Sequence, residues 1–202
     1  NGRTEHAVVY DPVRDELFSA SRGRGAQLNN KRIRVSSRKG LDGAVVATSF
    51  PFRKRELLPV YSRIFQSVYT IIEDIRRIGT ASLDLAWVAA GRMDGFFEIG
   101  LKPWDVAAGA LIVREAGGVV LDFEGQDGVE EAGTIIAAPY KIMTPLLKII
   151  SEKWKNRTRA AKSSRLAPIT PSLFRPGKIP NHSEWPVHTF RWLGAGRSSL
   201  AV

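Results

Sequence analysis

The sequence of 202 residues contains no cysteine and only three histidines. The absence of cysteine excludes disulfide bonds, thiolate metal sites and a cysteine nucleophile. No run of 18 uninterrupted apolar residues occurs either, which argues against a membrane-spanning helix and against a membrane partner. Residues 1–20 lack the basic start and the apolar stretch of a signal peptide, so we expect a cytoplasmic protein.

Common catalytic motifs are missing as well. His6 lies at one end of the chain and His182 and His188 at the other, which argues against a histidine-based triad or a two-histidine zinc pair. There is no Gly-Lys-Ser/Thr phosphate loop, and the stretch RGRGAQ (22–27) has two glycines but no helical pattern after it. These absences argue against nucleotide binding by the usual glycine-rich loops.

Acidic residues are scarce in the last quarter of the chain. Residues 1–150 hold 20 Lys and Arg against 18 Asp and Glu, whereas residues 151–202 hold 10 against 2. From residue 154 onward the helical and strand periodicity stops. We therefore expect residues 154–202 to form a basic, Pro/Ser-rich tail that is disordered, or a sequencing or reading-frame artefact. The alternative is a Trp-containing arm that binds RNA through positive charge and base stacking.

Alternating apolar and polar residues predict strands near the start of the chain. The pattern indicates two strands around a polar turn, at 6–12 and 16–29, followed by an edge strand at 31–37. We interpret residues 1–42 as the remnant of an N-terminal sheet.

Strands begin to alternate with helices at residue 43. Apolar residues at helical spacing predict the helices, with Thr80 as the N-cap of one and Pro145 as a point of interruption in the last. The helices are expected at 55–72, 80–91, 104–116 and 140–154, and the strands at 43–50, 73–79, 92–100, 119–123 and 133–139. This alternation indicates a layered α/β fold, here as an α/β subdomain over residues 43–153.

Asp105 stands at the start of the 104–116 helix, directly after Trp104. Its ordinary interpretation is a helix cap that accepts hydrogen bonds from backbone N–H groups two or three residues further on. The alternative is a ligand for a hard cation such as Mg²⁺, and a carboxylate has enough lone pairs for both roles. The small residues at 107–109 predict close packing of this helix against its neighbours, which would hold Asp105 in a fixed place.

The stretch WDVAAGALIVREAGG (104–118) resembles the C-terminal signature of the inositol monophosphatase family. The resemblance extends over roughly residues 2–153, is strongest to the bacterial branch, and covers only the C-terminal portion of the family pattern. It includes the stretches GRTEHAVVYDP, ELFSASRGRGAQLN, ATSFPF and RRIGTASLDLAWVAAGRMDGFFEIG. The resemblance implies a layered α/β/α/β/α sugar-phosphatase fold, of which this chain would hold the C-terminal α/β part and a remnant of the first sheet.

The same resemblance implies an activity. Members of this family are Mg²⁺-dependent phosphomonoesterases that hydrolyse inositol monophosphate, usually as homodimers, and their metal ions activate a water and neutralise phosphoryl charge. The expected ligand is therefore a small sugar or polyol phosphate. Fructose 1,6-bisphosphate and an adenosine phosphate are alternative substrates, which the inositol-type spacing between Glu98 and Asp105 disfavours.

Six residues match positions that bind metal or substrate in the family. Asp105 matches a metal-binding aspartate that is also expected to bind substrate, and Glu98 matches the carboxylate that accepts hydrogen bonds from inositol hydroxyls. Arg76 matches a substrate-side arginine, with a role at the dimer interface as the alternative. The segment that lines the sugar is matched by Gly79, Thr80 and Ala81.

The matched residues also have ordinary structural interpretations. By pattern alone, Glu98 would be solvated at the end of a strand, and Arg76 would be one of a solvent-facing pair. Thr80 would be an N-cap and nothing more. Three further acids are assigned to surfaces or turns, namely Asp84, Asp94 and Asp122.

The sequence departs from the family pattern at the earlier metal motif. The Glu-Glu pair and the Asp-Pro-Ile/Leu-Asp-Gly-Thr/Ser motif are both missing, and DPVRDE (11–16) has the wrong spacing to replace them. One aspartate holds Mg²⁺ poorly, because the ion needs several converging oxygens. We therefore expect a truncated chain that is inactive or weakly active. The alternative is a non-catalytic protein that binds RNA or the transcription machinery, a role in which members of the bacterial branch are implicated.

Overall fold

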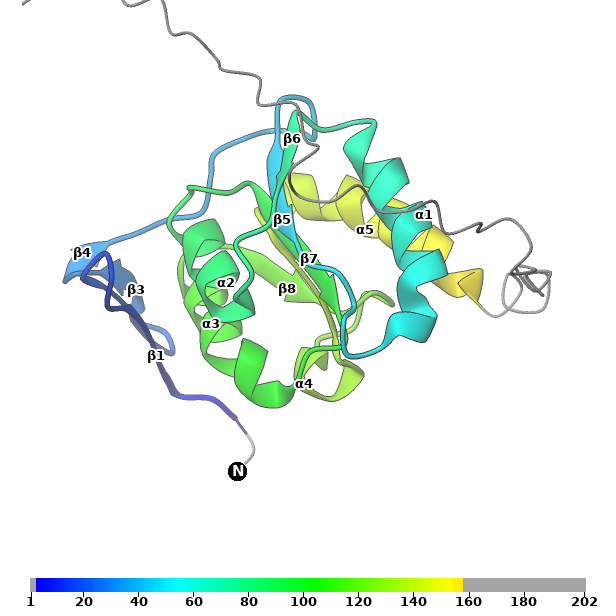
Figure 1. Ribbon diagram of the computed structural model, residues 1–202. Coiled ribbons are helices and arrows are strands. Elements are labelled where there is room, and N and C mark those ends of the chain that lie inside the picture. Colours follow the sequence, from blue (N-terminus) through cyan, green and yellow to red (C-terminus); the bar gives the residue numbers. More distant parts are fainter. Residues whose placement is uncertain (1–2, 158–202) are drawn as a thin grey trace, which may run out of the picture. The chain divides into compact units, whose positions relative to one another are not determined.

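The computed structural model describes residues 3–157, so the tail expected from residue 154 lies almost entirely outside the described residues. The described chain forms two β-sheets with helices around them (Figure 1). None of its helices combines the length and the apolar character that crossing a membrane requires.

The first sheet is an antiparallel meander with the strand order β1-β2-β3-β4. In β1, positions 7, 9 and 11 are buried and the positions between them are exposed, as expected for a strand with one face on the core. The expected edge strand at 31–37 is shorter, because the chain leaves the sheet after Arg32. The Val35 N–H then bonds to the Ala116 carbonyl at 3.2 Å. The strands are β1 (His6–Asp11), β2 (Glu16–Ser21), β3 (Gly25–Leu28) and β4 (Lys31–Arg32).

The second sheet is mixed, with the strand order β6-β5-β7-β9-β8. Strands β6, β5 and β7 are parallel, whereas β9 runs antiparallel to β7 and β8. Every residue of β7 and β9 is buried, which is typical of central strands covered on both faces. The strands are β5 (Val45–Thr48), β6 (Asp74–Arg76), β7 (Gly95–Ile99), β8 (Val119–Leu121) and β9 (Thr134–Ala138).

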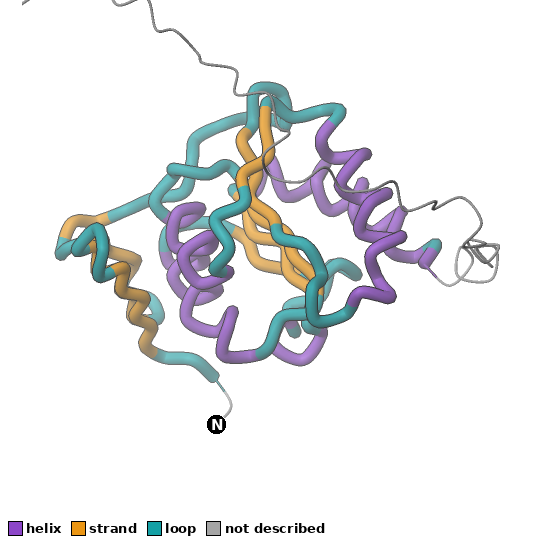
Figure 2. The backbone as a smooth tube through the Cα atoms, in the orientation of Figure 1, coloured by secondary structure: helices purple, strands orange, loops and turns teal. Residues whose placement is uncertain are grey.

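Helices cover both faces of the second sheet (Figures 1 and 2). Two of them lie between the two sheets, and the other two cover the opposite face, so the layers follow the order β/α/β/α. One apolar core joins the first sheet to the inner helices, and a second core lies between the second sheet and the outer helices. The layered α/β fold is therefore confirmed. The inner helices are α2 (Ala81–Ala89) and α3 (Pro103–Glu115), and the outer ones are α1 (Leu58–Tyr69) and α5 (Tyr140–Lys155).

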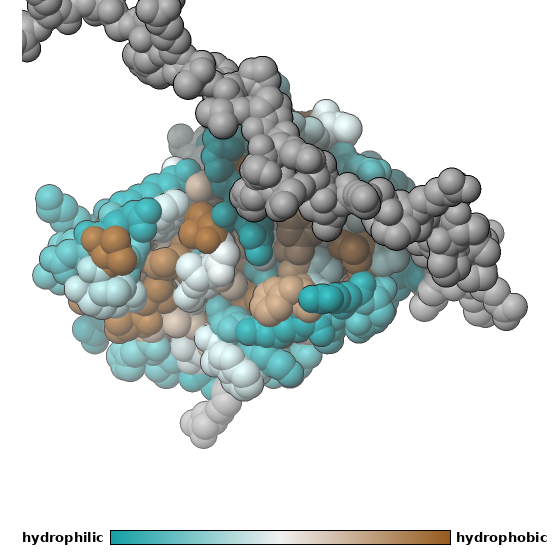
Figure 3. Space-filling model, in the orientation of Figure 1, coloured by the Kyte–Doolittle hydropathy of each residue, from teal (hydrophilic) through white to brown (hydrophobic). Residues whose placement is uncertain are grey.

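The outer face of the first sheet carries exposed apolar side chains. Val8 and Tyr10 in β1 and Leu17 in β2 are all exposed. Hydrophobic residues are visible at the surface on this side of the molecule in Figure 3. In the five-layer fold that the family resemblance implies, a further helical layer would cover this face.

Three further elements differ from the sequence-based expectation. The single strand expected at 16–29 is two strands, β2 and β3, joined by a turn. The expected interruption at Pro145 is wrong, since α5 is continuous. Proline removes a single N–H from the helix, and the buried face of α5, which includes Ile142, Leu146 and Ile150, still packs against its neighbours. Between the strands expected at 119–123 and 133–139, where no helix is expected, the chain forms a short helix, α4 (Val129–Ala132), which buries Val129.

Asp94 and Asp122 are both buried, which corrects their assignment to the surface. The carboxylate of Asp94 accepts hydrogen bonds from the side chains of Ser36 and Arg38 and from the Val45 N–H, so it ties the connection between the sheets to β5. Asp122 does lie in a turn, where it accepts two backbone hydrogen bonds after β8. Both carboxylates are buried because their hydrogen bonds replace water.

The inner helices approach each other closely at Gly109. A Cβ atom at this position would lie 2.6 Å from both Cβ and Cδ1 of Leu85 in α2. Such a distance is far below van der Waals contact, so only glycine allows the observed spacing of α2 and α3. The close packing expected from the small residues at 107–109 is therefore confirmed at this point.

We predict that Gly109→Ala lowers the free energy of unfolding by roughly 2 kcal/mol, because the added methyl group overpacks the α2–α3 contact. Urea denaturation followed by circular dichroism measures this change. Gly40→Ala is the matched control, since a methyl group at Gly40 would meet no atom within 4 Å and this glycine has no positive φ angle. Equal stability of the two variants would contradict the steric argument.

Candidate functional site

A hollow of about 210 Å³ opens at the carboxyl edge of the second sheet. The parallel strands β5 and β7 end at this edge, and helices α2 and α3 begin there. Ligands of α/β proteins commonly bind outside the carboxyl ends of parallel strands. The hollow is lined by Ser49, Phe52, Arg53, Gly79, Thr80, Ala81, Ser82, Glu98, Leu101, Trp104 and Asp105.

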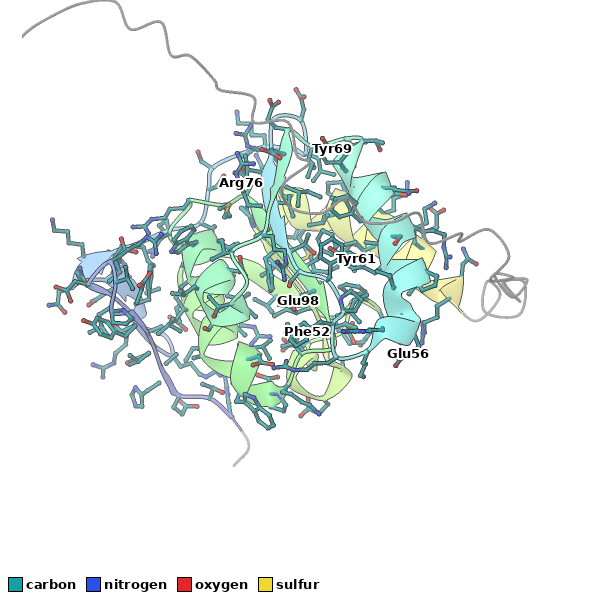
Figure 4. The ribbon with its side chains drawn as sticks, in the orientation of Figure 1. Phe52, Glu56, Tyr61, Tyr69, Arg76 and Glu98 are labelled. Atoms are coloured by element: carbon teal, nitrogen blue, oxygen red, sulfur yellow. The ribbon has the colours of Figure 1, made fainter. Side chains whose placement is uncertain are left out.

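Five of the six residues selected from the sequence line this one hollow, although they come from three separate elements. Arg76 does not, because its guanidinium pairs with Asp74 on the same strand. Figure 4 shows Glu98 in the middle of the view beside Phe52, and Arg76 further up toward Tyr69. The predicted roles of all six residues stay predictions, but their positions divide them into one group of five and a separate arginine.

Asp105 occupies the third position of α3 rather than its cap. Its Oδ2 atom accepts a hydrogen bond from the N–H of Lys102, the N-cap residue, at 2.9 Å. The same oxygen is 2.9 Å from Nη1 of Arg53. The expected cap, directed at N–H groups further along the helix, is therefore wrong. The carboxylate instead reaches back to the N-cap residue, at a helix end where the dipole favours negative charge.

Glu98 in β7 is 4% exposed, which overturns the interpretation of a solvated glutamate. Burial, together with the neighbouring carboxyls of Asp84 and Asp105, raises the pKa of Glu98 to about 8. The cations of Arg53 and Arg77 oppose this rise only in part. Glu98 is therefore mainly protonated at neutral pH, so it can donate as well as accept a hydrogen bond.

The turn before α2 presents backbone groups to the hollow. Gly79 has a φ angle of +95°, a conformation that side-chain-bearing residues rarely adopt. Thr80 is the N-cap residue by position, as predicted, but its hydroxyl makes no capping hydrogen bond and lies 3.3 Å from the Ser82 hydroxyl. The first N–H groups of α2 have no partner within the helix, so they can donate to oxygens of a ligand.

Asp84 is a buried member of this region that the sequence analysis places wrongly at a surface or turn. Its side chain is 0% exposed, and burial raises its pKa to about 7. A helical signal was available, since Asp84 stands one turn before the buried Val88 on the same face of α2. This spacing predicts burial, whereas the residue type alone predicts exposure.

Two arginines next to the hollow carried no recognisable sequence signal. The guanidinium of Arg53 stacks on the ring of Phe52, with 4.9 Å between its central carbon and the ring centroid. Arg77, the neighbour of Arg76, stacks on Phe50 at 5.8 Å. Their placement depends on how the 49–53 loop folds over the sheet edge, which no local pattern specifies.

The described residues do not fit a magnesium ion on their own. No group of three or more His, Cys, Asp or Glu side chains gathers anywhere within residues 3–157 in a way that could hold a metal. Asp105 brings one carboxylate, and the guanidinium of Arg53 already neutralises it. Mg²⁺ requires near-octahedral oxygen ligands, so this arrangement suits an uncharged or anionic organic ligand better than a cation.

The chain belongs to the inositol monophosphatase family, whose family model matches residues 1–156. Among curated proteins, Nus factor SuhB of Salmonella typhimurium strain LT2 is 54% identical over 146 residues, which are 72% of this chain and 55% of that protein. Nus factor SuhB of Pseudomonas aeruginosa is 56% identical over 151 residues, or 74% of this chain and 56% of that protein. The chain thus spans about half the length of the curated relatives it matches.

Solved structures with related sequences also match this chain over part of their length. The extragenic suppressor protein suhB from Bartonella henselae superimposes with a TM-score of 0.72 and 44% identity, covering 75% of this chain and 58% of that one. The inositol monophosphatase from Anabaena matches with a TM-score of 0.72 and 36% identity, covering 75% and 63%. The family and the partial coverage inferred from the sequence are confirmed.

We predict that Glu98→Gln stabilises the protein at pH 8 but not at pH 4.5. The unfolded chain releases the Glu98 proton near 4.5, whereas the folded chain keeps it to about 8. The folded state therefore binds more protons in this window, and its stability falls as the pH rises through it. Removing the titration should add roughly 4 kcal/mol to the free energy of unfolding at pH 8.

Denaturant unfolding at the two pH values measures this effect. Glu56→Gln is the control, because Glu56 is an exposed glutamate on the surface, labelled in Figure 4. A pH-independent effect of Glu98→Gln would show that Glu98 releases its proton at the same pH in the folded and unfolded chains, against this account.

Proposed function

We propose that this chain acts as a non-catalytic binding protein that associates with RNA or the transcription machinery. The observation that carries the proposal is that only two acids line the hollow: Asp105 is paired with Arg53, and Glu98 is mainly protonated. Within residues 3–157 no group of three acidic or histidine side chains gathers to hold a metal. A chain with an incomplete metal site would not hydrolyse a phosphomonoester, whereas binding of RNA or of a protein would not require the metal. Relatives that are 53–56% identical carry the name Nus factor SuhB, which supports the same choice.

In such a protein the hollow serves as a recognition site for a sugar or polyol phosphate. Protonated Glu98 would donate to a hydroxyl oxygen, and the N–H groups at Gly79–Ala81 would donate to a second one. Arg53 and Arg77 provide positive charge for a phosphate group on the same ligand. These groups bind and orient a ligand, and none of them requires a metal ion.

The second candidate is a Mg²⁺-dependent phosphomonoesterase acting on inositol monophosphate. Its support is the lining of the hollow, where Glu98, Asp105 and the Gly79–Ala81 turn stand together as the family pattern implies. Asp105 would be one metal ligand, and the other ligands would have to come from outside the described residues. Homodimer formation, with Arg76 at the interface or near the substrate, belongs to this candidate as well.

We predict no phosphate release above background when the chain is incubated with myo-inositol 1-phosphate and Mg²⁺. The reason is that a lone carboxylate paired with Arg53 cannot assemble a hydrolytic metal site. A colorimetric phosphate assay gives the measurement, with Asp105→Asn as the matched variant. Robust turnover that disappears in Asp105→Asn would favour the phosphatase over the binding protein.

We predict that the chain is retained on immobilised RNA and that retention weakens as salt rises, because phosphate contacts release counterions. The measurement compares the full chain with a version that ends at residue 157, the last residue described. If both versions bind, residues 1–157 contribute to the RNA contact. If only the full chain binds, the basic segment beyond residue 157 accounts for it, and absence of RNA retention by either version would leave a protein of the transcription machinery as the partner.

A further inference from the structure

A second hollow, of about 340 Å³, lies next to the candidate site, and none of the roles above uses it. Phe52 lines both hollows, so they share this side chain. Figure 4 shows Phe52 between Glu98, which lines the first hollow, and Glu56, which stands just before α1. The atoms exposed in the second hollow are apolar, and they belong to Phe50, Pro51, Phe52, Arg55 and Leu58.

The rings at the second hollow are exposed, although large apolar side chains more often lie inside a protein. Phe50 is 49% exposed and Phe52 is 58% exposed, and Leu58 beside them is exposed as well. Trp104, which lines the first hollow together with Phe52, is also exposed. Apolar side chains that gather at one place on the surface indicate a contact site. We refer to Phe50, Phe52 and Leu58 as the aromatic platform.

The aromatic platform is held in place by neighbouring side chains. The Phe50 ring lies against the buried Tyr61 ring, with 5.4 Å between their centroids. Arg53 stacks on Phe52 and Arg77 stacks on Phe50. A guanidinium plane stacks on flat ligands as an aromatic ring does, and it adds positive charge. The platform is therefore a preorganised surface for stacking, which lowers the entropic cost of binding.

Positive charge surrounds the aromatic platform. Three consecutive cations stand at 53–55 and all are exposed, whereas Glu56 is the only acid in the sequence from residue 49 to residue 58. Within residues 3–157, no acidic side chain forms an ion pair with Lys54, Arg55 or Arg77. The surface thus combines exposed rings with positive charge that the described part of the chain does not neutralise.

This combination fits a ligand that carries both negative charge and flat apolar faces. Single-stranded RNA has both, since Lys and Arg pair with its phosphates and its unpaired bases stack on aromatic side chains. An apolar protein partner would bury Lys54 and Arg55 without pairing them, which costs free energy. A second copy of this chain fits less well too, because a two-fold contact would bring the same cations of both copies together.

We propose that the aromatic platform is the surface on which single-stranded RNA contacts this protein: an unpaired base stacks on Phe50 or Phe52, and the neighbouring phosphates pair with Lys54 and Arg55. This inference rests on the association with RNA proposed above, and it adds the surface and the form of the RNA. The stacked base carries a ribose phosphate, which is itself a polyol phosphate. Because Phe52 lines both hollows, that group lies next to the recognition site proposed for such a ligand.

The proposal distinguishes single-stranded from double-stranded RNA. In a duplex the base faces are stacked on one another, so only phosphates and sugars are offered to the protein. Charge from any part of the chain adds affinity for both forms of RNA. A comparison of the two forms therefore isolates the contribution of base stacking.

The test measures binding of fluorescein-labelled oligoadenylate to the full chain by fluorescence anisotropy, with its duplex with oligouridylate as the comparison. We expect Phe50→Leu combined with Phe52→Leu to weaken binding of the single strand about tenfold and to leave binding of the duplex unchanged. Tyr69→Leu is the matched control, because Tyr69 is also an exposed aromatic residue but lies at the far end of α1. Binding of both forms should be unchanged in this variant.

Two further measurements examine the charges and the unaltered chain. Lys54→Gln combined with Arg55→Gln should weaken binding of both forms and make it less sensitive to salt, because fewer counterions are released. In the unaltered chain, oligoadenylate should shift the ring proton resonances of Phe50 and Phe52 more than those of Tyr69 in NMR spectra. This measurement needs no substitution, so it applies even if the phenylalanine variant does not fold.

The outcomes separate this inference from the proposed function. If the chain binds RNA but neither the phenylalanine changes nor the ring resonances respond, the aromatic platform is not the contact, and the proposed association with RNA still stands. If the chain binds neither form of RNA, that association and this inference both fall. If the phenylalanine changes instead abolish self-association of the chain in analytical ultracentrifugation, the platform binds a second copy, and the proposal is wrong.

Discussion

The close contact between α2 and α3 is the constraint on which the rest of the structure depends. These two helices fill the layer between the sheets, and Gly109 lets them approach to a distance that any side chain would prevent. Because both helices begin at the carboxyl edge of the second sheet, their spacing sets the width of the hollow between their first turns. The part of the site that the two helices supply is therefore a consequence of helix packing, whereas Phe52 and Arg53 reach the hollow from the 49–53 loop.

The electrostatics of the hollow follow from how few polar partners the fold supplies there. Asp105 is balanced directly by Arg53, while Glu98 and Asp84 have no such partner and respond to burial by keeping their protons longer. Burying two acids is costly, so their presence in the region of the Gly79–Ala81 turn supports the proposed binding role. The arginines stacked on Phe50 and Phe52 add positive charge at the rim of the same hollow.

Much of the fold could be predicted from the sequence, because periodicity reports burial directly. The alternation in β1 and the apolar spacing in α1 and α5 located these elements to within a few residues. The continuity of α5 through Pro145 could not be predicted, since tertiary packing outweighed a local signal. The same holds for the site. Asp105 and Glu98 could be selected from the sequence because they stand in a long ordered motif. Arg53 could not, because it comes from a loop whose course only the folded chain determines.

The central claim is that this chain presents a recognition site for a polyol phosphate in which Arg53, rather than a metal ion, balances Asp105. A crystal structure of the chain soaked with myo-inositol 1-phosphate and Mg²⁺ tests this claim most directly. The account predicts a polyol ring against Glu98 and Thr80, with the pair between Arg53 and Asp105 intact. An octahedrally coordinated ion on Asp105, with Arg53 displaced, would contradict it.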